Sequence, residues 1–588
     1  MLQNSELTDL LEERRKDSDF LWVSRSMKIQ MPHMLPSELK LSRNQIINTV
    51  LNSPRVKEVI SYLAKCQNVY KYVIERKAYV ILQEMGSKAH LPTVRWLGFF
   101  ITKALKKIFR NLYINERMIF DLKKQMSNYQ VQYIYIPSHR SYLDFVLLSY
   151  ILFSYDMSLP NIASGMDFYQ MRFIGEILRK TGAFYMRRSF SNDSLYKEIF
   201  KAYVSCLVNH SDRAIEFFIE GTRSRSQKSI EPKYGFLSII LDTYLQGSVP
   251  EIQFLPISIS YDRPLEEKLF VYELLGVPKP KETTTALLRS LSMLKNLVSY
   301  GSVFFNIGEP ISASQYVTSK DRKAKIINPD YKLPSTITEN LAYDIIYTHQ
   351  KNTVLTTFNI IALLFNERVQ TYPANPYTLQ TLAEDYKWYK NWLSSLGEIL
   401  ASLETHSELL TLDDSKILNL KNIYVEMKTE KYTNIKGHNL NQRTMEVAVP
   451  AINLTIYVNP TLFFLVKLGI ITATVGLDSI HIVLGTITNQ NVLRECQKQV
   501  EIALFEGKNS RPHPYCLSLD LFKSTLSNLL QQGIVIISDK EGIYFVDKIQ
   551  MEYLILKLHQ LPLLHPSGFY SDISLSALNT LVHIQAKL

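Results

Sequence analysis

The pattern of hydrophobic and polar residues changes twice along the chain. Residues 1–115 place Glu, Lys and Arg between apolar residues with few turn signals, which predicts a helical region. Over residues 116–320, short runs rich in Ile, Val, Phe and Tyr alternate with helical stretches, a pattern typical of an α/β layer fold. Helical runs return over residues 321–588, which we expect to form a mainly helical region with a short hairpin.

Within this frame, strands are predicted where β-branched and aromatic residues gather between turn residues: over Val131–Ile136, Asn161–Ala163, Ala183–Met186, Ala214–Ile219, Leu255–Ser260 and Val303–Ile307. The apolar run Ser141–Phe153 predicts a buried helix, and the polar, Pro-containing residues 313–340 predict a linker. Residues 533–537 and 543–546 predict a hairpin. A helix before a hairpin also fits a winged-helix module, but a structural hairpin is favoured because no DNA-recognition motif accompanies it.

The longest apolar runs are too short or too polar to span a bilayer. A spanning helix needs about 20 mostly apolar residues. The run 460–477 contains Lys467 and is followed by Asp478, and the run Phe145–Tyr155 covers only half that length. Both runs are expected to be buried core, and contact with a membrane is expected to be peripheral. The N-terminus has no apolar segment of the kind that marks a secretory signal.

Charge and cysteine content narrow the function classes. The 588 residues contain 66 Lys and Arg against 55 Asp and Glu, a formal charge of +11. This charge fits nucleic acid, an anionic membrane surface or a phosphorylated substrate, and nucleic acid is disfavoured because no recognition motif is present. The four cysteines, Cys66, Cys206, Cys496 and Cys516, are scattered, which excludes a disulfide scaffold and a zinc site built from cysteines.

The first candidate motif pairs His139 with Asp144. His139 follows a predicted strand, and Asp144 falls in the first turn of the next predicted helix, where α/β folds place ligands. A His serves as a general base near neutral pH, and a carboxylate on one ring nitrogen leaves the other free to accept a proton. Ser141 and Asp144 also fit a capping box, so Asp144 has a structural interpretation that is compatible with the catalytic one.

A second and a fourth motif follow or form predicted strands. Arg187 and Arg188 come directly after the strand 183–186, and neighbouring side chains of an extended strand point to opposite faces. One of the two arginines could therefore face a site while the other pairs at the surface, and two solvated arginines are the alternative. Residues 255–262 offer no obvious catalytic group and are expected to form a buried strand that lines the cleft.

The third motif is a turn rich in groups that bind anions. Gly221 permits a tight turn or a close approach of the backbone. Arg223 and Arg225 offer planar, permanently charged forks suited to phosphate, Thr222 adds a hydroxyl donor, and Lys233 follows. A solvated surface loop is the alternative, but the density of donors after an apolar strand favours an anion site. The chain has no Walker A, G-x-S-x-G or G-x-G-x-x-G sequence, which disfavours nucleotide triphosphate, hydrolase and dinucleotide chemistry.

Together the motifs supply a base, its orienting carboxylate and a cluster of arginines, as transfer onto a hydroxyl of a small phosphorylated molecule requires. In this order they resemble the four sequence blocks of the glycerolipid acyltransferase family: His139 with Asp144, residues 182–188, residues 220–226 and residues 256–260. The longer strings over 136–145, 165–168 and 272–282 are similar to the branch of that family that acts on dihydroxyacetone phosphate.

The resemblance implies transfer of a long-chain fatty acyl group from acyl-CoA to a hydroxyl, with acyl-CoA as a co-substrate and with no cofactor, metal or acyl-enzyme. His139 would be the base and Asp144 would orient it. The acceptor phosphate would be held by Arg187 or Arg188 together with Arg223 and Arg225, with Lys233 as a further partner. Glu220, Gly221 and Thr222 would shape the acceptor pocket, and the fourth block would line the acyl-CoA channel.

The resemblance does not decide between two possible acceptor molecules. Dihydroxyacetone phosphate is the expected acceptor, in the first step of ether-lipid (plasmalogen) synthesis, and glycerol 3-phosphate is the alternative. A catalytically silent protein that binds acyl-CoA is a third hypothesis, disfavoured by the intact His139 and Asp144. The resemblance also implies a partner, alkylglycerone-phosphate synthase, which uses the product.

The residues Ala586, Lys587 and Leu588 have the form of a peroxisomal targeting tripeptide. They predict recognition by the peroxisomal import receptor and a location on the lumenal side of the peroxisomal membrane.

Overall fold

The computed structural model describes residues 7–26, 41–128, 131–169, 171–187, 193–278, 299–363 and 440–461, with Tyr386, single positions between 494 and 519, and residues 535–537 and 544–546. The predicted carboxy-terminal hairpin is present as two antiparallel strands, β10 (Val535–Ile537) and β11 (Tyr544–Val546). Arg188 and the tripeptide at 586–588 lie outside the described residues.

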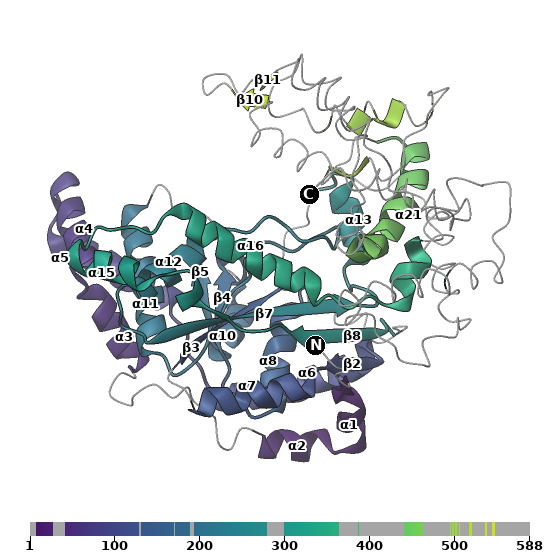
Figure 1. The fold of residues 1–588 in the computed structure, drawn as a ribbon, viewed down its shortest axis with the longest axis horizontal. Coiled ribbons are helices and arrows are strands. Elements are labelled where there is room, and N and C mark those ends of the chain that lie inside the picture. The colour runs from purple at the N-terminus through teal and green to yellow at the C-terminus, as the bar shows by residue number, and fades with distance from the viewer. Residues whose placement is uncertain are drawn as a thin grey trace.

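A nine-stranded sheet forms the centre of the molecule (Figure 1). Its strands are β1 (Thr8–Asp9), β2 (Asn111–Ile114), β3 (Val131–Pro137), β4 (Asn161–Gly165), β5 (Ala183–Met186), β6 (Ile215–Glu216), β7 (Glu251–Tyr261), β8 (Ser302–Ile307) and β9 (Ile311–Ser312). They lie in the order β1-β2-β8-β7-β3-β6-β4-β5, with β9 paired to β7. From β7 to β5 every pairing is parallel, whereas β8 runs antiparallel to β7. The predicted α/β class is confirmed.

Helices cover both faces of the sheet and enclose two hydrophobic cores. The first core is formed with α3 (Arg43–Leu51), α4 (Pro54–Cys66), α5 (Lys71–Met85), α11 (Ser194–His210), α12 (Tyr234–Leu245) and α16 (Ser335–Lys351). The second is formed with α1 (Leu10–Lys16), α2 (Asp19–Arg25), α6 (Leu91–Ile108), α7 (Glu116–Asn128) and α8 (Asp144–Ser154). The remaining described helices include α9 (Met166–Tyr169), α10 (Arg172–Lys180), α13 (Glu267–Leu274), α15 (Ser319–Ile327) and α21 (Gln442–Val458).

The side chains of β3 show how the sequence divides between the two cores. Successive side chains of a strand point to opposite faces of the sheet. Ile134 and Ile136 therefore join the first core, while Tyr133 and Tyr135 join the second. All four are almost fully buried, as expected of a central strand in a parallel sheet with helices on both faces.

The structure corrects three predictions. The strand expected over 214–219 is only two residues long, because the chain leaves the sheet after β6 to form the loop of the third motif. The amino-terminal region is not purely helical, since β1 and β2 join the sheet edge. Residues 313–340 are not an extended linker: α15 begins with a capping box between Thr318 and Asp321, and α16 packs against α12 and β7.

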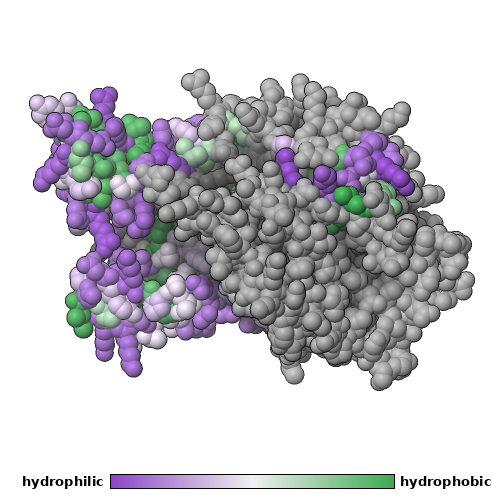
Figure 2. Space-filling view, turned by 90° about the horizontal axis from the view of Figure 1, so that it is seen from above, coloured by the Kyte–Doolittle hydropathy of each residue, from purple (hydrophilic) through white to green (hydrophobic). Residues whose placement is uncertain are grey.

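The predicted buried helix over residues 141–153 is present as α8, which begins at Asp144. Among the described residues, no helix combines the length and apolar character needed to cross a bilayer. Viewed from above, the described surface at the end that carries α4 and α5 is mostly hydrophilic, with hydrophobic residues in small groups (Figure 2).

Candidate active site

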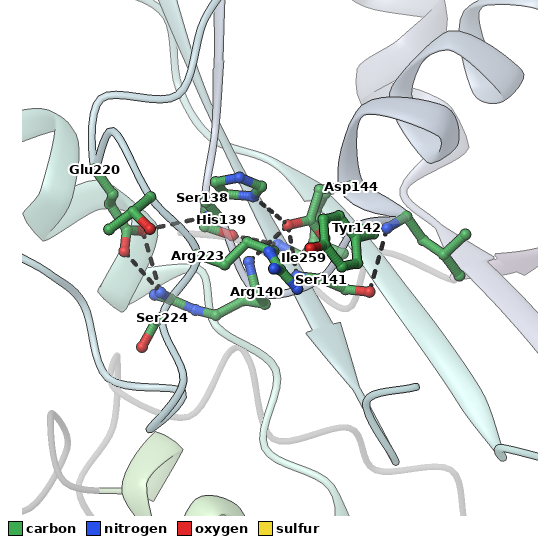
Figure 3. Close-up of polar contacts among 12 residues, drawn as sticks. Ser138, His139, Arg140, Ser141, Tyr142, Asp144, Glu220, Arg223, Ser224 and Ile259 are labelled. Atoms are coloured by element: carbon green, nitrogen blue, oxygen red, sulfur yellow. Dashed lines mark hydrogen bonds and ion pairs between the residues drawn. The ribbon is translucent and has the colours of Figure 1, made fainter. Parts of the chain in front are cut away.

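His139 and Asp144 are brought together at the carboxyl end of β3. The Nδ1 atom of His139 lies 3.0 Å from Oδ2 of Asp144, the first residue of α8 (Figure 3). The same oxygen accepts hydrogen bonds from the backbone N–H groups of Arg140 (2.6 Å) and Ser141 (2.8 Å), and Oδ1 accepts one from the hydroxyl of Tyr261 (2.6 Å). Asp144 is fully buried, so these donors fix its carboxylate in place.

This arrangement sets the protonation pattern of the His139 ring. An ionised carboxylate only accepts hydrogen bonds, so Nδ1 carries the hydrogen and Nε2 keeps its lone pair. The ring stacks on Phe218 at 4.1 Å between centroids, and its side chain is 17% exposed. His139 lines a cavity. It therefore has the features of an oriented general base: one nitrogen is tethered and the other is free to accept a proton.

The capping interpretation of Asp144 is confirmed in part. The carboxylate accepts from the Ser141 backbone as the third residue of a capping box would. The box is not completed, because α8 begins at Asp144 itself, with Leu143 at the N-cap. The Ser141 hydroxyl accepts instead from the backbone N–H of Leu143 at 3.2 Å and donates to Glu266 at 2.9 Å. The carboxylate at the helix start thus also orients the His139 ring.

Tyr261 is a member of the site that the sequence analysis missed. It lies at the end of β7 on the same face as Ile257 and Ile259, which places its hydroxyl next to Asp144. Burial and the Asp144 carboxylate raise the pKa of Tyr261 well above its usual value, so the phenol remains a donor. The available signal was its spacing of two and four residues from Ile259 and Ile257, which places all three on one face of the strand.

The fourth motif has a different role from the one expected. The cavity is lined by none of the residues 255–260, so the expectation that this block lines the channel is wrong for this cavity. Its alternate side chains face α16 instead: Ser258 donates to the carbonyl oxygen of His349 at 2.7 Å. On the other face, Tyr261 contacts Asp144. The strand supports the base rather than the substrate channel.

Glu220 and Arg140 form a buried ion pair behind His139. The Nη1 atom of Arg140 lies 3.1 and 3.0 Å from the two carboxylate oxygens of Glu220, which is fully buried. Glu220 also accepts from the backbone N–H groups of His139 and Ile230. Burial raises the pKa of Glu220, and the Arg140 guanidinium opposes that rise. Glu220 borders the cavity, but its contacts show that it also fixes the His139 backbone to the third motif.

The two arginines of the third motif line the cavity and are each paired with a glutamate. Arg223 lies over the ring of Tyr142 at 3.2 Å and has Nη1 3.4 Å from Glu266. The Nε atom of Arg225 lies 2.8 Å from Glu273. Glu266 also accepts from the Tyr142 backbone, so it holds the first and third motifs together. Glu266 lies in none of the sequence motifs, and Glu273 lies in the string 272–282, to which the sequence analysis gave no role in the site.

Gly221 and Thr222 shape the turn between these arginines and the cavity. Gly221 has a positive φ of +67°, and a Cβ there would lie 3.1 Å from Cγ of Lys233. A side chain would be strained at this position. The Thr222 hydroxyl accepts from Nη1 of Arg225 at 2.7 Å. Lys233 is exposed and has no ion-pair partner among the residues that the structure describes.

Arg187 borders the cavity from the end of β5. Its Nη1 atom lies 2.7 Å from Asp193, and its guanidinium lies over the ring of Tyr196 at 4.2 Å. The side chain remains 38% exposed, so one side of the guanidinium stays available to an anion. Arg188 is outside the described residues, and its predicted role stays a prediction.

A cavity of about 640 Å³ joins these groups to an apolar interior. Its polar part is bordered by His139, Arg187, Glu220, Gly221, Thr222, Arg223, Arg225 and Lys233. Its apolar part lies between α6 and α8 and is bordered by Val94, Leu97, Gly98, Ile101, Phe145, Val146, Phe153, Leu159 and Ile162. The cavity lining thus combines the base and cationic side chains with a large set of apolar side chains. Across the described part of the chain, no group of three His, Cys, Asp or Glu side chains could hold a metal ion.

The carboxy-terminal region contacts the third motif directly. The Nδ2 atom of Asn459, just after α21, donates to the carbonyl oxygen of Ser226 at 2.6 Å. On the same helix, the Tyr457 hydroxyl contacts Glu267 of α13. Residues beyond 440 therefore help to hold the loop that carries the arginines.

Comparisons with known proteins agree with this geometry. Residues 120–260 match the family model described as acyltransferase, and residues 270–498 match that of the glycerol-3-phosphate acyltransferase C-terminal region. The chain is 36% identical over 403 residues to a dihydroxyacetone phosphate acyltransferase of Oryctolagus cuniculus, covering 67% of this chain and 57% of that one. It is 35% identical over 434 residues to the protein of that name from Homo sapiens, covering 70% of this chain and 62% of that one.

A bacterial relative is more distant. A glycerol-3-phosphate acyltransferase of Pseudomonas paraeruginosa is 32% identical over 327 residues, covering 55% of this chain and 38% of that one. The chain thus spans about three fifths of the length of the mammalian relatives it matches. The matched family models include both the sheet that carries His139 and the carboxy-terminal helix that supports the third motif. Residues 120–260 and 270–498 therefore belong to the acyltransferase and glycerol-3-phosphate acyltransferase C-terminal families that these two models describe.

Proposed function

We propose that the protein transfers a long-chain fatty acyl group from acyl-CoA to the free hydroxyl of dihydroxyacetone phosphate. The observation that carries the proposal is that one cavity is lined by the oriented His139, by cationic side chains and by many apolar side chains. A phosphorylated acceptor and a fatty acyl chain need opposite environments, and the lining of this cavity offers both. The similarity to the two mammalian relatives supports this acceptor.

In this mechanism His139 activates the acceptor. Nε2 accepts the proton of the acceptor hydroxyl as its oxygen forms a bond to the thioester carbonyl carbon. Collapse of the tetrahedral intermediate breaks the carbon–sulfur bond, and the CoA sulfur takes the proton back from His139. Asp144 and Tyr261 keep the ring in the required tautomer through their hydrogen bonds.

The cations at the mouth hold the acceptor phosphate in this scheme. Arg187 and Lys233 are the most accessible, while Arg223 and Arg225 are balanced by Glu266 and Glu273. The fatty chain would lie between α6 and α8, where a Cβ on Gly98 would come 2.9 Å from the Phe153 ring. The close approach of these two helices bounds the space for hydrocarbon.

Glycerol 3-phosphate is the second candidate acceptor, favoured by the bacterial relative. The two acceptors differ at one carbon, so a competition assay with both acceptors and labelled palmitoyl-CoA decides between them. We expect a higher kcat/KM with dihydroxyacetone phosphate. A higher kcat/KM with glycerol 3-phosphate would assign the other acceptor, and binding of acyl-CoA without turnover with either would contradict the enzymatic proposal.

We also propose a place for the reaction in the cell. Ala586, Lys587 and Leu588 form the proposed address for the peroxisomal import receptor, with the protein peripheral to the lumenal side of the membrane. There it would begin ether-lipid synthesis, and alkylglycerone-phosphate synthase would use its product. Deleting these three residues should leave a fluorescently tagged protein in the cytosol. Import of the shortened protein at the normal level would refute the tripeptide as its address.

A further inference from the structure

Helix α6 presents apolar residues on two opposite sides. On its inner side, Val94, Leu97, Gly98 and Ile101 border the cavity. On its outer side, one exposed stripe is formed by residues spaced three or four positions apart: Pro92, Trp96, Phe100, Lys103 and Lys107. Soluble helices normally place polar residues on the outer face. The outer aromatic residues of α6 therefore need an explanation beyond packing within the chain.

The two aromatic side chains of the stripe are among the most exposed large apolar residues of the described chain. Trp96 is 66% exposed and Phe100 is 58% exposed. Their rings stack on each other with centroids 5.9 Å apart and an interplanar angle of 22°. Together they form a ridge that packs against no buried core.

Helix α2 extends this surface. It packs alongside α6, and its Trp22 points inward, with ring contacts to Tyr150 and Phe153 of α8. The preceding residues point outward: Phe20 is 71% exposed and Leu21 is 51% exposed. We refer to Phe20, Leu21, Trp96 and Phe100 as the α2–α6 surface.

Basic residues surround the apolar ones. Lys103 and Lys106 lie on either side of Asp19, with Lys103 3.5 Å from its carboxylate. Lys107 and Arg25 are exposed and form no ion pair within the part of the chain that the structure describes. Lys103 and Lys106 thus share the Asp19 carboxylate, and Lys107 and Arg25 add two further cations. Asp17, exposed just before α2, adds one more acidic group, so the cations remain in excess. Aromatic rings with adjacent Lys and Arg are the composition that binds the headgroup region of an anionic bilayer.

We propose that the α2–α6 surface docks on an anionic lipid bilayer. The apolar side chains insert at the level of the headgroups, and the cations contact lipid phosphates and carboxylates. Helix α6 lies between this surface and the apolar residues that line the cavity, so only the thickness of one helix separates the two. If the proposed function holds, the cavity that receives the fatty chain lies directly above the lipid from which acyl-CoA partitions.

Vesicle flotation with the purified chain tests the proposal without measuring turnover. Binding to vesicles of phosphatidylcholine with about 30% phosphatidylserine should exceed binding to pure phosphatidylcholine. The difference should become smaller at high salt, because salt screens the attraction between exposed charges. The double substitution Trp96→Ala and Phe100→Ala should reduce the partition coefficient by about tenfold, given the apolar area lost. Bromolipids should quench Trp96, and the quenching should be lost in Trp96→Phe.

The chain offers a matched control. Tyr70 and Tyr72 are also stacked and exposed, with ring centroids 5.9 Å apart and exposures of 78% and 64%, but they lie at the start of α5. Replacing both by Ala should leave vesicle binding unchanged. Equal loss in both double variants, or no loss in the α6 variant, would overturn the proposal. So would a concentration-dependent dimer that the α6 variant abolishes, since a second copy would then be the occupant. An inactive enzyme with normal vesicle binding would contradict the proposed function alone.

Discussion

Replacement of His139 by Ala should reduce kcat for acyl transfer by about 100- to 10,000-fold, the usual contribution of a general base. The thermal unfolding midpoint should change little, for two reasons. The ring borders a cavity, so its loss leaves few packing contacts unmade, and the backbone N–H of His139 keeps its hydrogen bond to Glu220 after the substitution. Steady-state turnover of palmitoyl-CoA with saturating acceptor provides the measurement. KM for the acceptor should change less than kcat, because the proposed mechanism assigns the acceptor phosphate to other side chains.

His90 is a suitable control for this substitution. It is exposed at the start of α6, where its Nδ1 lies 2.9 Å from the Thr93 hydroxyl, and it does not border the cavity. His90→Ala should retain the turnover of the parent protein. Wild-type turnover in His139→Ala would show that the catalytic assignment is wrong, and a parallel fall in both variants would indicate a general loss of folding.

Replacement of Arg140 by Met should give the largest loss of stability among the site residues. It removes the guanidinium from a fully buried carboxylate that is 3.0 Å away and leaves Glu220 without its counter-charge. Loss of one partner of such a pair costs about 3–5 kcal/mol in the free energy of unfolding. Because burial already raises the pKa of Glu220, the unpaired carboxyl should take up a proton, which limits the cost. Urea unfolding followed by tryptophan fluorescence measures the change.

A double variant separates the charge from the packing. Adding Glu220→Gln to Arg140→Met removes the unpaired charge and keeps an oxygen that can accept from the His139 backbone. The double variant should therefore be more stable than Arg140→Met alone. Lys201, which pairs with Glu198 on the surface of α11, gives the control: its replacement by Ala should cost under about 1 kcal/mol. If Arg140→Met also lowered the free energy of unfolding by less than about 1 kcal/mol, the buried pair of Arg140 and Glu220 would not be what stabilises the site.

The central part of the fold could be predicted because its strands are long and apolar. Val131–Pro137 and Ser302–Ile307 are bounded by turn residues and are paired within the sheet, so local pattern and tertiary structure agree. Thr8–Asp9 and Ile311–Ser312 are two-residue strands with no periodicity to detect. They exist because a neighbouring strand offers hydrogen-bonding groups, and this information is absent from the local sequence.

The site could be predicted only as far as its residues lie in short motifs. His139 and Asp144 are five positions apart, and the sequence placed both at a strand end. Tyr261 and Glu266 reach the same motif from more than 100 positions away, and no spacing relates them to it. The arginines were predicted as phosphate ligands from their type alone. Their pairing with Glu266 and Glu273, which reduces their free charge, depends on the position of α13 and required the structure.

The hydrogen bond from Asn459 to the Ser226 carbonyl joins positions 233 residues apart. Ser226 belongs to the family's acyltransferase segment and Asn459 to its carboxy-terminal segment. If the proposed function holds, replacing Asn459 should weaken substrate binding, although this residue belongs to none of the sequence motifs. The same bond bears on recombination between relatives, because a chimaera joined between the two segments would take the loop that carries Arg223 and Arg225 from one parent and its support from the other.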